Sequence, residues 1–373
     1  SDIALLDSDN EGTNLYSDGG EDLWFDSKIG AVGISNLYRV NDKGYFKTVL
    51  SLSASYNGII NDSLSVSDGT PIPWYRNKSV VGKQSLRVSY NHKFNARHLT
   101  KAGVFADRRF FDLQDRWYNG SAALWDTLTN FDGYAYFIQP YVQHQYRITD
   151  DIIFNGGLHY QVFTLNNTSS LEPRAGIKWK MNPKNELSFG YGLHSQVAPT
   201  RVFFEKTLDP FGNEVEANRN VGMTKSHHFV LGYDHSINQH VRIKSEAYYQ
   251  NIFDALVDVR PNSYSVLNYG ANFDVEFPDS LTNNGTGENY GFEMTFEHFL
   301  HKGFYYLVTA SLYQSKYKGS DGIERNTAFN GNYTFNALAG KEFHFKSKKP
   351  EADQKAKSSL LLDIKFTLNG GQR

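Results

Sequence analysis

The residues best suited to bind a cation are acidic and lie near the start of the chain. The run DSDNEG at 7–12 has carboxylates at alternate positions and glycine sixth, and Asp18 falls at the twelfth place. Calcium loops share this spacing, although their twelfth ligand is usually Glu and helices flank them. No helical pattern flanks this run. A calcium site built from Asp7, Asp9, Glu11 and Asp18 is therefore one hypothesis, and a solvated acidic loop is the other.

Aromatic side chains with polar neighbours occur in the longer connections between regularly patterned segments. Stacked rings with nearby hydrogen-bonding groups could hold a sugar or an aromatic chelate. The alternative is that the rings pack the loops against one another. The candidate ligand-binding residues are Trp74, Tyr75, Trp125, Phe203, Phe204, Phe211, Arg219, Tyr264 and Tyr269.

Catalytic patterns are missing from the sequence. It contains no HExxH, no glycine-rich phosphate loop and no nucleophile elbow. The absence of cysteine excludes disulfides, thiolate zinc sites and cysteine nucleophiles. Adjacent histidines such as His227 and His228 would point to opposite faces of a strand and could not share one ion. We therefore predict neither enzymatic activity nor a bound cofactor, apart from the possible calcium.

The elements that must position these residues are strands. In ELSFGYGLH at 186–194, Leu187, Phe189, Tyr191 and Leu193 fall on one face and polar residues on the other. Successive strand side chains point to opposite sides, so this alternation predicts a ribbon with one apolar and one polar face. Some runs are long: 133–149 would span roughly 56 Å at ~3.3 Å per residue.

The connections alternate between tight turns and longer loops, a rhythm typical of outer-membrane barrels with short periplasmic turns and long external loops. A long charged connection at 346–357, where a short turn is expected, is an exception. We expect about 14 strands, at 28–40, 44–57, 83–95, 98–117, 133–149, 151–165, 171–181, 185–197, 225–237, 240–256, 288–299, 303–318, 332–346 and 358–369.

The composition agrees with a β-sheet that has lipid on one face and water on the other. Aromatic residues make up 15% of the 373 residues, whereas hydrophobic residues reach only 40% and mean hydropathy is −0.52. The net charge of −2 argues against a nucleic-acid partner. No run approaches the ~20 apolar residues of a membrane-spanning helix, and Ser1–Asp7 has no signal-peptide pattern. Because 368–373 end in a turn, we interpret the chain as a fragment.

Four motifs resemble a known family. They are LEPR at 171–174, FGYGLHSQ at 189–196, EAYYQNI at 246–252 and GENYGFEM at 287–294. In order and spacing they resemble the barrel portion of TonB-dependent outer-membrane receptors. The resemblance implies a 22-stranded barrel closed by an N-terminal plug, which imports a scarce nutrient (a metal chelate, cobalamin or a glycan) with energy from TonB. Neither a plug, a TonB-contacting segment nor the family's final strands are visible.

The expected fold is therefore all-β, with residues 1–373 forming part of an antiparallel transmembrane β-barrel. The resemblance implies a location in the outer membrane of a Gram-negative bacterium. Its implied partners are outer-membrane lipid, TonB through the missing plug, and a small-molecule or glycan ligand. One alternative is a passive porin-like or adhesin barrel. A soluble β-rich glycan-binding module is another, but it predicts repeats of ~40–50 residues that we do not find.

Overall fold

The computed structural model describes residues 20–270, 277–345 and 358–371, which are almost entirely strand. Two single-turn 3-10 helices, η1 (Thr200–Phe204) and η2 (Val266–Asn268), lie in long connections. The strands are β1 (Glu21–Asn41), β2 (Gly44–Leu64), β3 (Pro71–Lys93), β4 (His98–Asn119), β5 (Leu124–Arg147), β6 (Ile152–Phe163), β7 (Thr168–Asn182), β8 (Asn185–Gln196), β9 (Thr207–Leu208), β10 (Glu214–Val215), β11 (Thr224–Ser236), β12 (Val241–Asp258), β13 (Leu281–His301), β14 (Phe304–Lys318), β15 (Glu324–Asn326), β16 (Tyr333–His344) and β17 (Ser359–Asn369).

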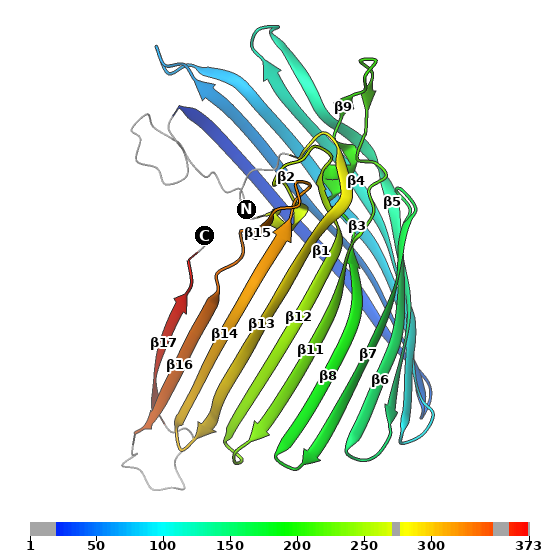
Figure 1. The fold of residues 1–373 in the computed structure, drawn as a ribbon, viewed down its shortest axis with the longest axis vertical. Coiled ribbons are helices and arrows are strands. Elements are labelled where there is room, and N and C mark those ends of the chain that lie inside the picture. The colour runs from blue at the N-terminus through cyan, green and yellow to red at the C-terminus, as the bar shows by residue number, and fades with distance from the viewer. Residues whose placement is uncertain (1–19, 271–276, 346–357, 372–373) are drawn as a thin grey trace.

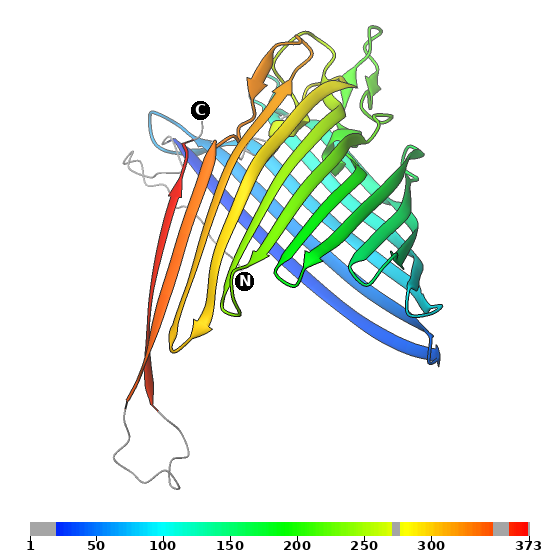
Figure 2. The ribbon, with the colours of Figure 1, turned by 60° about the horizontal axis from the view of Figure 1, so that its bottom comes forward.

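One antiparallel sheet forms a curved wall. Its hydrogen-bonded path runs β1-β2-β3-β4-β5-β6-β7-β8-β11-β12-β13-β14-β16-β17, so neighbours in the sheet follow chain order. β15 pairs with β14, and β9 and β10 form a separate hairpin. Figures 1 and 2 show the strands tilted, with β1 and β2 passing behind β11 to β14 at the opposite slant. This is the antiparallel barrel wall that the alternating sequence pattern predicts.

The register sorts side chains onto two faces. Phe189 in β8 pairs with Ile177 in β7 and Leu231 in β11, and paired residues share a face. We call the face that carries these exposed apolar side chains the outer face. The opposite, inner face carries polar residues such as Glu172 and Asp115, and η1 packs against it. The apolar rows thus meet the surroundings rather than each other.

All fourteen expected strands are present in the path, but several are longer than the alternation indicated. The loop expected at 57–82 is mostly strand, because β2 continues to Leu64 and β3 begins at Pro71. β5 and β13 likewise begin several residues early. These extensions lie at the end of the wall that has the long loops. Both faces can meet water there, so apolar and polar residues no longer alternate although backbone pairing continues. The short strands β9, β10 and β15 were not predicted.

Aromatic rings form two rows on the outer face of β1 to β5. Near the short turns, Tyr38 pairs with Phe46 and Phe46 with Tyr90. Toward the loops, Phe110 pairs with Tyr134 and lies over Gly82, where a Cβ would collide with its ring. Eight residues of β3 separate Gly82 from Tyr90, roughly 26 Å at ~3.3 Å per residue. Because the strands of a membrane barrel are tilted by ~35–45°, this distance corresponds to a height of about 20 Å. The two ring rows are placed as aromatic girdles are, on either side of an apolar band.

Candidate functional site

A long connection between β8 and β11 folds back onto the inner face. We call residues 197–223, which include η1, the mouth segment; Figure 1 shows it near the upper ends of β4 and β5. Phe203 and Phe204 are each 1% exposed. The Phe204 ring stacks on Phe131 with centroids 3.7 Å apart, and Phe203 lies 5.7 Å from Phe163. The mouth segment therefore contributes to the buried apolar core at this end of the wall.

An ion pair fixes η1 to the wall. Arg201 Nε lies 2.9 Å from Asp115 Oδ2 in β4, and the Asp115 side chain is 3% exposed. The other carboxylate oxygen accepts hydrogen bonds from Tyr75 Oη at 2.6 Å and Asn77 Nδ2 at 2.5 Å. Burial lowers the pKa of Arg201, but Asp115, Tyr75 and Glu205 together more than offset this, and the net shift is upward. The guanidinium therefore stays charged where it anchors the segment.

Asparagine side chains join the mouth segment to its neighbours. Asn218, which is fully buried, accepts from Leu281 N at 2.7 Å and donates to Pro278 O at 3.3 Å. Asn283 exchanges hydrogen bonds with the backbone of Gly222. Asn166, beyond β6, donates to Val221 O at 2.8 Å. An amide side chain can donate and accept at once, so these residues hold irregular backbone in place without regular secondary structure.

A polar cluster lies on the inner face below the mouth segment and is centred on Glu172, which is 1% exposed. Its Oε2 lies 2.8 Å from His159 Nδ1 and 2.8 Å from Arg174 Nη2. Its Oε1 accepts from Gln161 Nε2 at 2.7 Å and from the Ser195 backbone at 2.8 Å. A buried carboxylate needs such partners to offset its lost hydration, and the cluster ties β6, β7 and β8 together.

Cations and rings alternate on the inner face of β3 to β6. Arg87 lies 5.3 Å from the Phe105 centroid, and Phe105 stacks on Tyr141 at 5.2 Å. Lys101 lies 5.7 Å from the same Tyr141 ring. Higher on β4, Arg109 lies 4.4 Å from the Phe137 centroid. These cation–π contacts hold the cations against the wall without neutralising them.

Arg109 also faces a second cation. Lys83 in β3 pairs directly with Arg109 in β4, and both line a hollow of about 260 Å³ that Thr200 of η1 also borders. Like charges opposite one another destabilise a sheet. Within the described residues neither side chain has an ion-pair partner, although the Asp107 charge acts on Arg109. This arrangement is suited to an anionic group.

The candidate ligand-binding residues do not form one site. Phe204 and Arg219 do meet, since the Arg219 guanidinium lies 5.0 Å from the Phe204 centroid. Phe203 lies in the same buried cluster as Phe204. Tyr75 turns toward Asp115 and Arg201. Trp74 contacts Trp117 edge-on at 5.3 Å, and both lie in strands rather than in a loop.

The remaining candidates lie apart. Trp125 is in β5, where Arg76 and Tyr118 contact its ring. Phe211 is 88% exposed at the tip of the β9–β10 hairpin. Tyr269 stacks on Phe277, and burial raises the pKa of the nearby Tyr264. Ligand contact through any of these residues stays a prediction.

The proposed calcium ligands Asp7, Asp9, Glu11 and Asp18 lie outside the described residues, so the calcium hypothesis stays untested. Among the residues that are described, no group of three or more metal-binding side chains occurs. His227 and His228 do take opposite faces: His227 stacks on Tyr191, whereas His228 lies 4.5 Å from His194.

Sequence reasoning missed the features that build this site. Glu172 was noted only as part of a motif, and Asp115, Arg201 and the joining asparagines were not singled out. Arg201 and the joining asparagines have partners far along the chain, which residue spacing does not reveal. The one usable signal was the acidic residue at an inner position of a strand, because such a residue needs a partner when buried.

Comparisons with known proteins agree with the geometry. A family model described as TonB dependent receptor-like, beta-barrel, matches residues 4–356. No curated protein matches the sequence. Within the described part of the chain, no helix is long and apolar enough to cross a membrane.

Solved structures show the same fold at low identity. The ferric yersiniabactin uptake receptor FyuA from Yersinia pestis is 10% identical, with TM-score 0.65 over 94% of this chain and 55% of its own. The ferric-catecholate import receptor Fiu from E. coli K12 is 11% identical, with TM-score 0.62 over 86% and 52%. The siderophore receptor PiuA from Acinetobacter baumannii is 11% identical, with TM-score 0.59 over 92% and 58%.

The chain spans about half the length of these structures. Three observations determine the family: the curved antiparallel wall, its apolar and polar faces, and the family match over most of the chain. A soluble β-rich module does not fit these observations. The chain belongs to the β-barrel family of TonB-dependent receptors, which lie in the outer membrane of Gram-negative bacteria.

Proposed function

We propose that this chain is part of the barrel of an active importer, which binds a scarce nutrient outside the cell and admits it with energy from TonB. Of the nutrient classes that the family suggests, an anionic metal chelate fits the wall best. Neither a cobalamin nor a glycan would need facing cations in its binding site to the same extent. The solved structures of similar fold include receptors described as importing ferric catecholate and ferric yersiniabactin.

The observation that carries this proposal is the facing pair Lys83 and Arg109. Their charges lie on the inner wall, next to the base of the mouth segment at Thr200. An anionic chelate would relieve their repulsion and form charge-assisted hydrogen bonds. Below them, Lys101, Phe105 and Tyr141 line a further hollow of about 590 Å³ that extends to His159 and Arg174. Arg87 lies against the Phe105 ring, and Lys101 lies against the Tyr141 ring. Rings flanked by cations favour an aromatic, negatively charged chelate.

Binding to the full-length receptor tests the ligand class. The probes are an anionic ferric tris-catecholate, a neutral ferric tris-hydroxamate and a neutral oligosaccharide, each followed by intrinsic fluorescence. We expect the catecholate to bind most tightly, and Lys83→Gln with Arg109→Gln to weaken it by about 100-fold if each lost charged contact contributes ~1.5 kcal/mol. The matched control is Lys47→Gln, which removes an inner-face cation near the short turns. Tighter binding of either neutral probe would exclude an anionic ligand.

Uptake tests the energy coupling separately. Cells that carry the receptor should accumulate the bound probe only when TonB is present. Accumulation that persists without TonB, at a rate proportional to external concentration, would instead support the passive porin-like alternative.

A further inference from the structure

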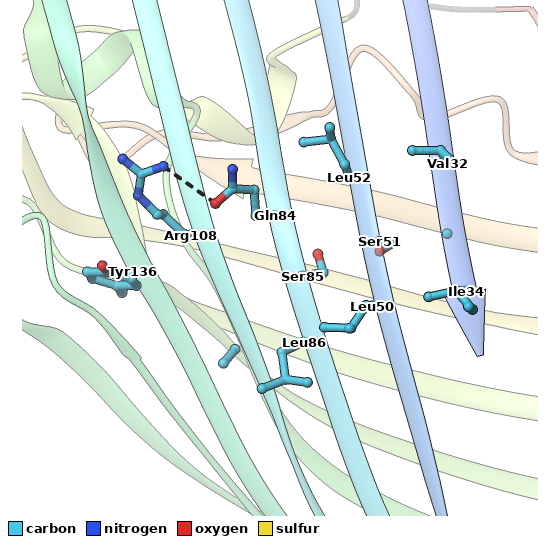
Figure 3. Close-up of a pocket in the computed structure, with 12 residues that line it drawn as sticks. Val32, Ile34, Leu50, Ser51, Leu52, Gln84, Ser85, Leu86, Arg108 and Tyr136 are labelled. Carbon is cyan, nitrogen blue, oxygen red and sulfur yellow. Dashed lines mark hydrogen bonds between the residues drawn. The ribbon is translucent and has the colours of Figure 1, made fainter. Parts of the chain in front are cut away.

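The outer face of β1 to β4 has a hollow of about 510 Å³. In Figure 3, the opposite wall lies behind these strands, so the hollow opens away from the interior. Its apolar lining consists of Val32, Ile34, Leu50, Leu52 and Leu86. Side chains on this face meet lipid in a membrane barrel, and the apolar lining of the hollow suits acyl chains.

A charged residue borders this apolar hollow. Arg108 in β4 is on the outer face, where it pairs with Gln84 on one side and Tyr136 on the other. Its Nη1 approaches Gln84 Oε1 at 3.5 Å, as Figure 3 shows. An arginine on the lipid face is costly near the bilayer midplane and tolerable near the interface. The position of Arg108 relative to the aromatic rows therefore decides how costly its charge is.

The Arg108 side chain reaches toward the headgroup level. Its guanidinium lies 4.4 Å from the ring centroid of Tyr134, one row closer to the loops than Arg108 itself. Long cationic side chains extend in this way so that their stems stay in the apolar layer and their charge reaches the interface. The charge is thus at the upper aromatic row, which faces the outer leaflet.

Arg108 also lacks the carboxylate partner that two other outer-face cations of the first four strands have. Lys78 pairs with Asp112 at 2.6 Å, and Lys28 pairs with Asp26 at 2.9 Å. Within residues 20–270, 277–345 and 358–371, Arg108 forms no ion pair. An unpaired guanidinium at the headgroup level, directly above an apolar hollow, is complementary to a molecule with an anionic head and acyl chains.

We propose that Arg108 and Gln84 bind a phosphate group of an outer-leaflet lipid whose acyl chain occupies the hollow. A guanidinium can donate two parallel hydrogen bonds to phosphate oxygens. The Gln84 amide adds a neutral donor, and the leucines beneath supply the surface for the chain. This site is on the opposite face of the wall from the proposed ligand cations, so it does not depend on the imported nutrient.

Native mass spectrometry of the full-length receptor in a neutral detergent tests this proposal, with a bis-phosphorylated lipid A as probe. We expect Arg108→Gln to raise the apparent Kd at least about tenfold, because a charged hydrogen bond is worth ~1.5–3 kcal/mol. Arg108→Lys, which keeps the charge, should retain most of the affinity and shows that the site tolerates substitution. Arg87→Gln is the matched control, since Arg87 also lies over a ring but on the inner face.

Two further arms identify the binding chemistry. The same lipid without its phosphates should bind wild type and Arg108→Gln equally weakly, and millimolar inorganic phosphate alone should not occupy the site. The proposal is wrong if Arg108→Gln binds lipid A as wild type does, or if Arg87→Gln loses as much affinity. Displacement of lipid A by inorganic phosphate would also overturn it, because the site would then recognise a free anion.

Discussion

Arg201 of the mouth segment and Asp115 of β4 form an ion pair 2.9 Å long that is largely out of contact with water. It joins η1 of the segment directly to the wall. Burial of the paired carboxylate means that losing Arg201 leaves a negative charge without its counterion, which is more damaging than losing an exposed pair.

We therefore expect Arg201→Ala to release η1 from the wall. The uncompensated charge of Asp115 should cost about 3 kcal/mol locally, so the Val202 amide, which donates to Pro199 O, should exchange with solvent about 100-fold faster. Hydrogen exchange on the full-length receptor measures this. Lys206→Ala breaks the exposed Lys206–Glu214 pair. This variant should change the free energy of opening at the Val202 amide by less than ~1 kcal/mol. Similar effects of both variants would contradict a special role for Arg201.

The two faces of the wall make a second prediction at adjacent positions. Phe189 is 46% exposed on the outer face, whereas Ser188 is on the inner face and approaches Gly232 O. Phe189→Arg should destabilise the folded barrel by ~2–4 kcal/mol near the midplane, and Ser188→Arg should cost far less. Refolding titrations into bilayers compare the two. Equal penalties would show that the faces are assigned incorrectly.

The alternation of apolar and polar residues predicted the wall well, because it identifies each strand from that strand's own sequence. The alternation around Phe189 identifies a strand without reference to any neighbour, and turns such as Lys302-Gly303 identify its end. Gly303 has φ of +72°, a conformation that favours glycine. Chain-order pairing then follows, because short turns force neighbouring strands together.

The site was less predictable because its contacts join segments that are far apart in the chain. Phe203 and Phe204 were predicted as ligand contacts. Both are buried against the wall, and ligand contact through them stays a prediction. No periodicity links Arg201 with Asp115, or Asn218 with Leu281. Nor could composition show that Lys83 and Arg109 would face each other, since that depends on the register between two strands.

The buried amide of Asn218 provides a third prediction. Asn218→Ala leaves Leu281 N and Pro278 O without their partner, which should cost about 1–3 kcal/mol. The Leu281 amide should then exchange roughly 10- to 100-fold faster. The exposed Asn213, which bonds to Asp209 within the same segment, gives the control Asn213→Ala. If Leu281 exchanges at the wild-type rate in Asn218→Ala, the amide does not join the two loops.

The loop after β14 should open in acid. Hydrogen bonds from the Arg325 guanidinium, and then from Ile323 N, lower the pKa of Asp321 below its usual value of 3.8. Because its pKa is lower in the folded protein, the ionised Asp321 carboxylate stabilises the loop fully at any pH above its unfolded-state pKa. That stabilisation is lost as the pH falls through its folded-state pKa. The loop should therefore hold at pH 5 and above and loosen below about pH 4.

Exchange of the Ile323 amide, corrected for its intrinsic pH dependence, follows this opening. In Asp321→Asn the Ile323 amide should exchange faster at neutral pH and show no further step in acid, because the titrating group is gone. Asp150→Asn, in a turn at the opposite end of the wall, should leave both the rate and the step unchanged. An acid step that survives in Asp321→Asn would assign the opening to another group.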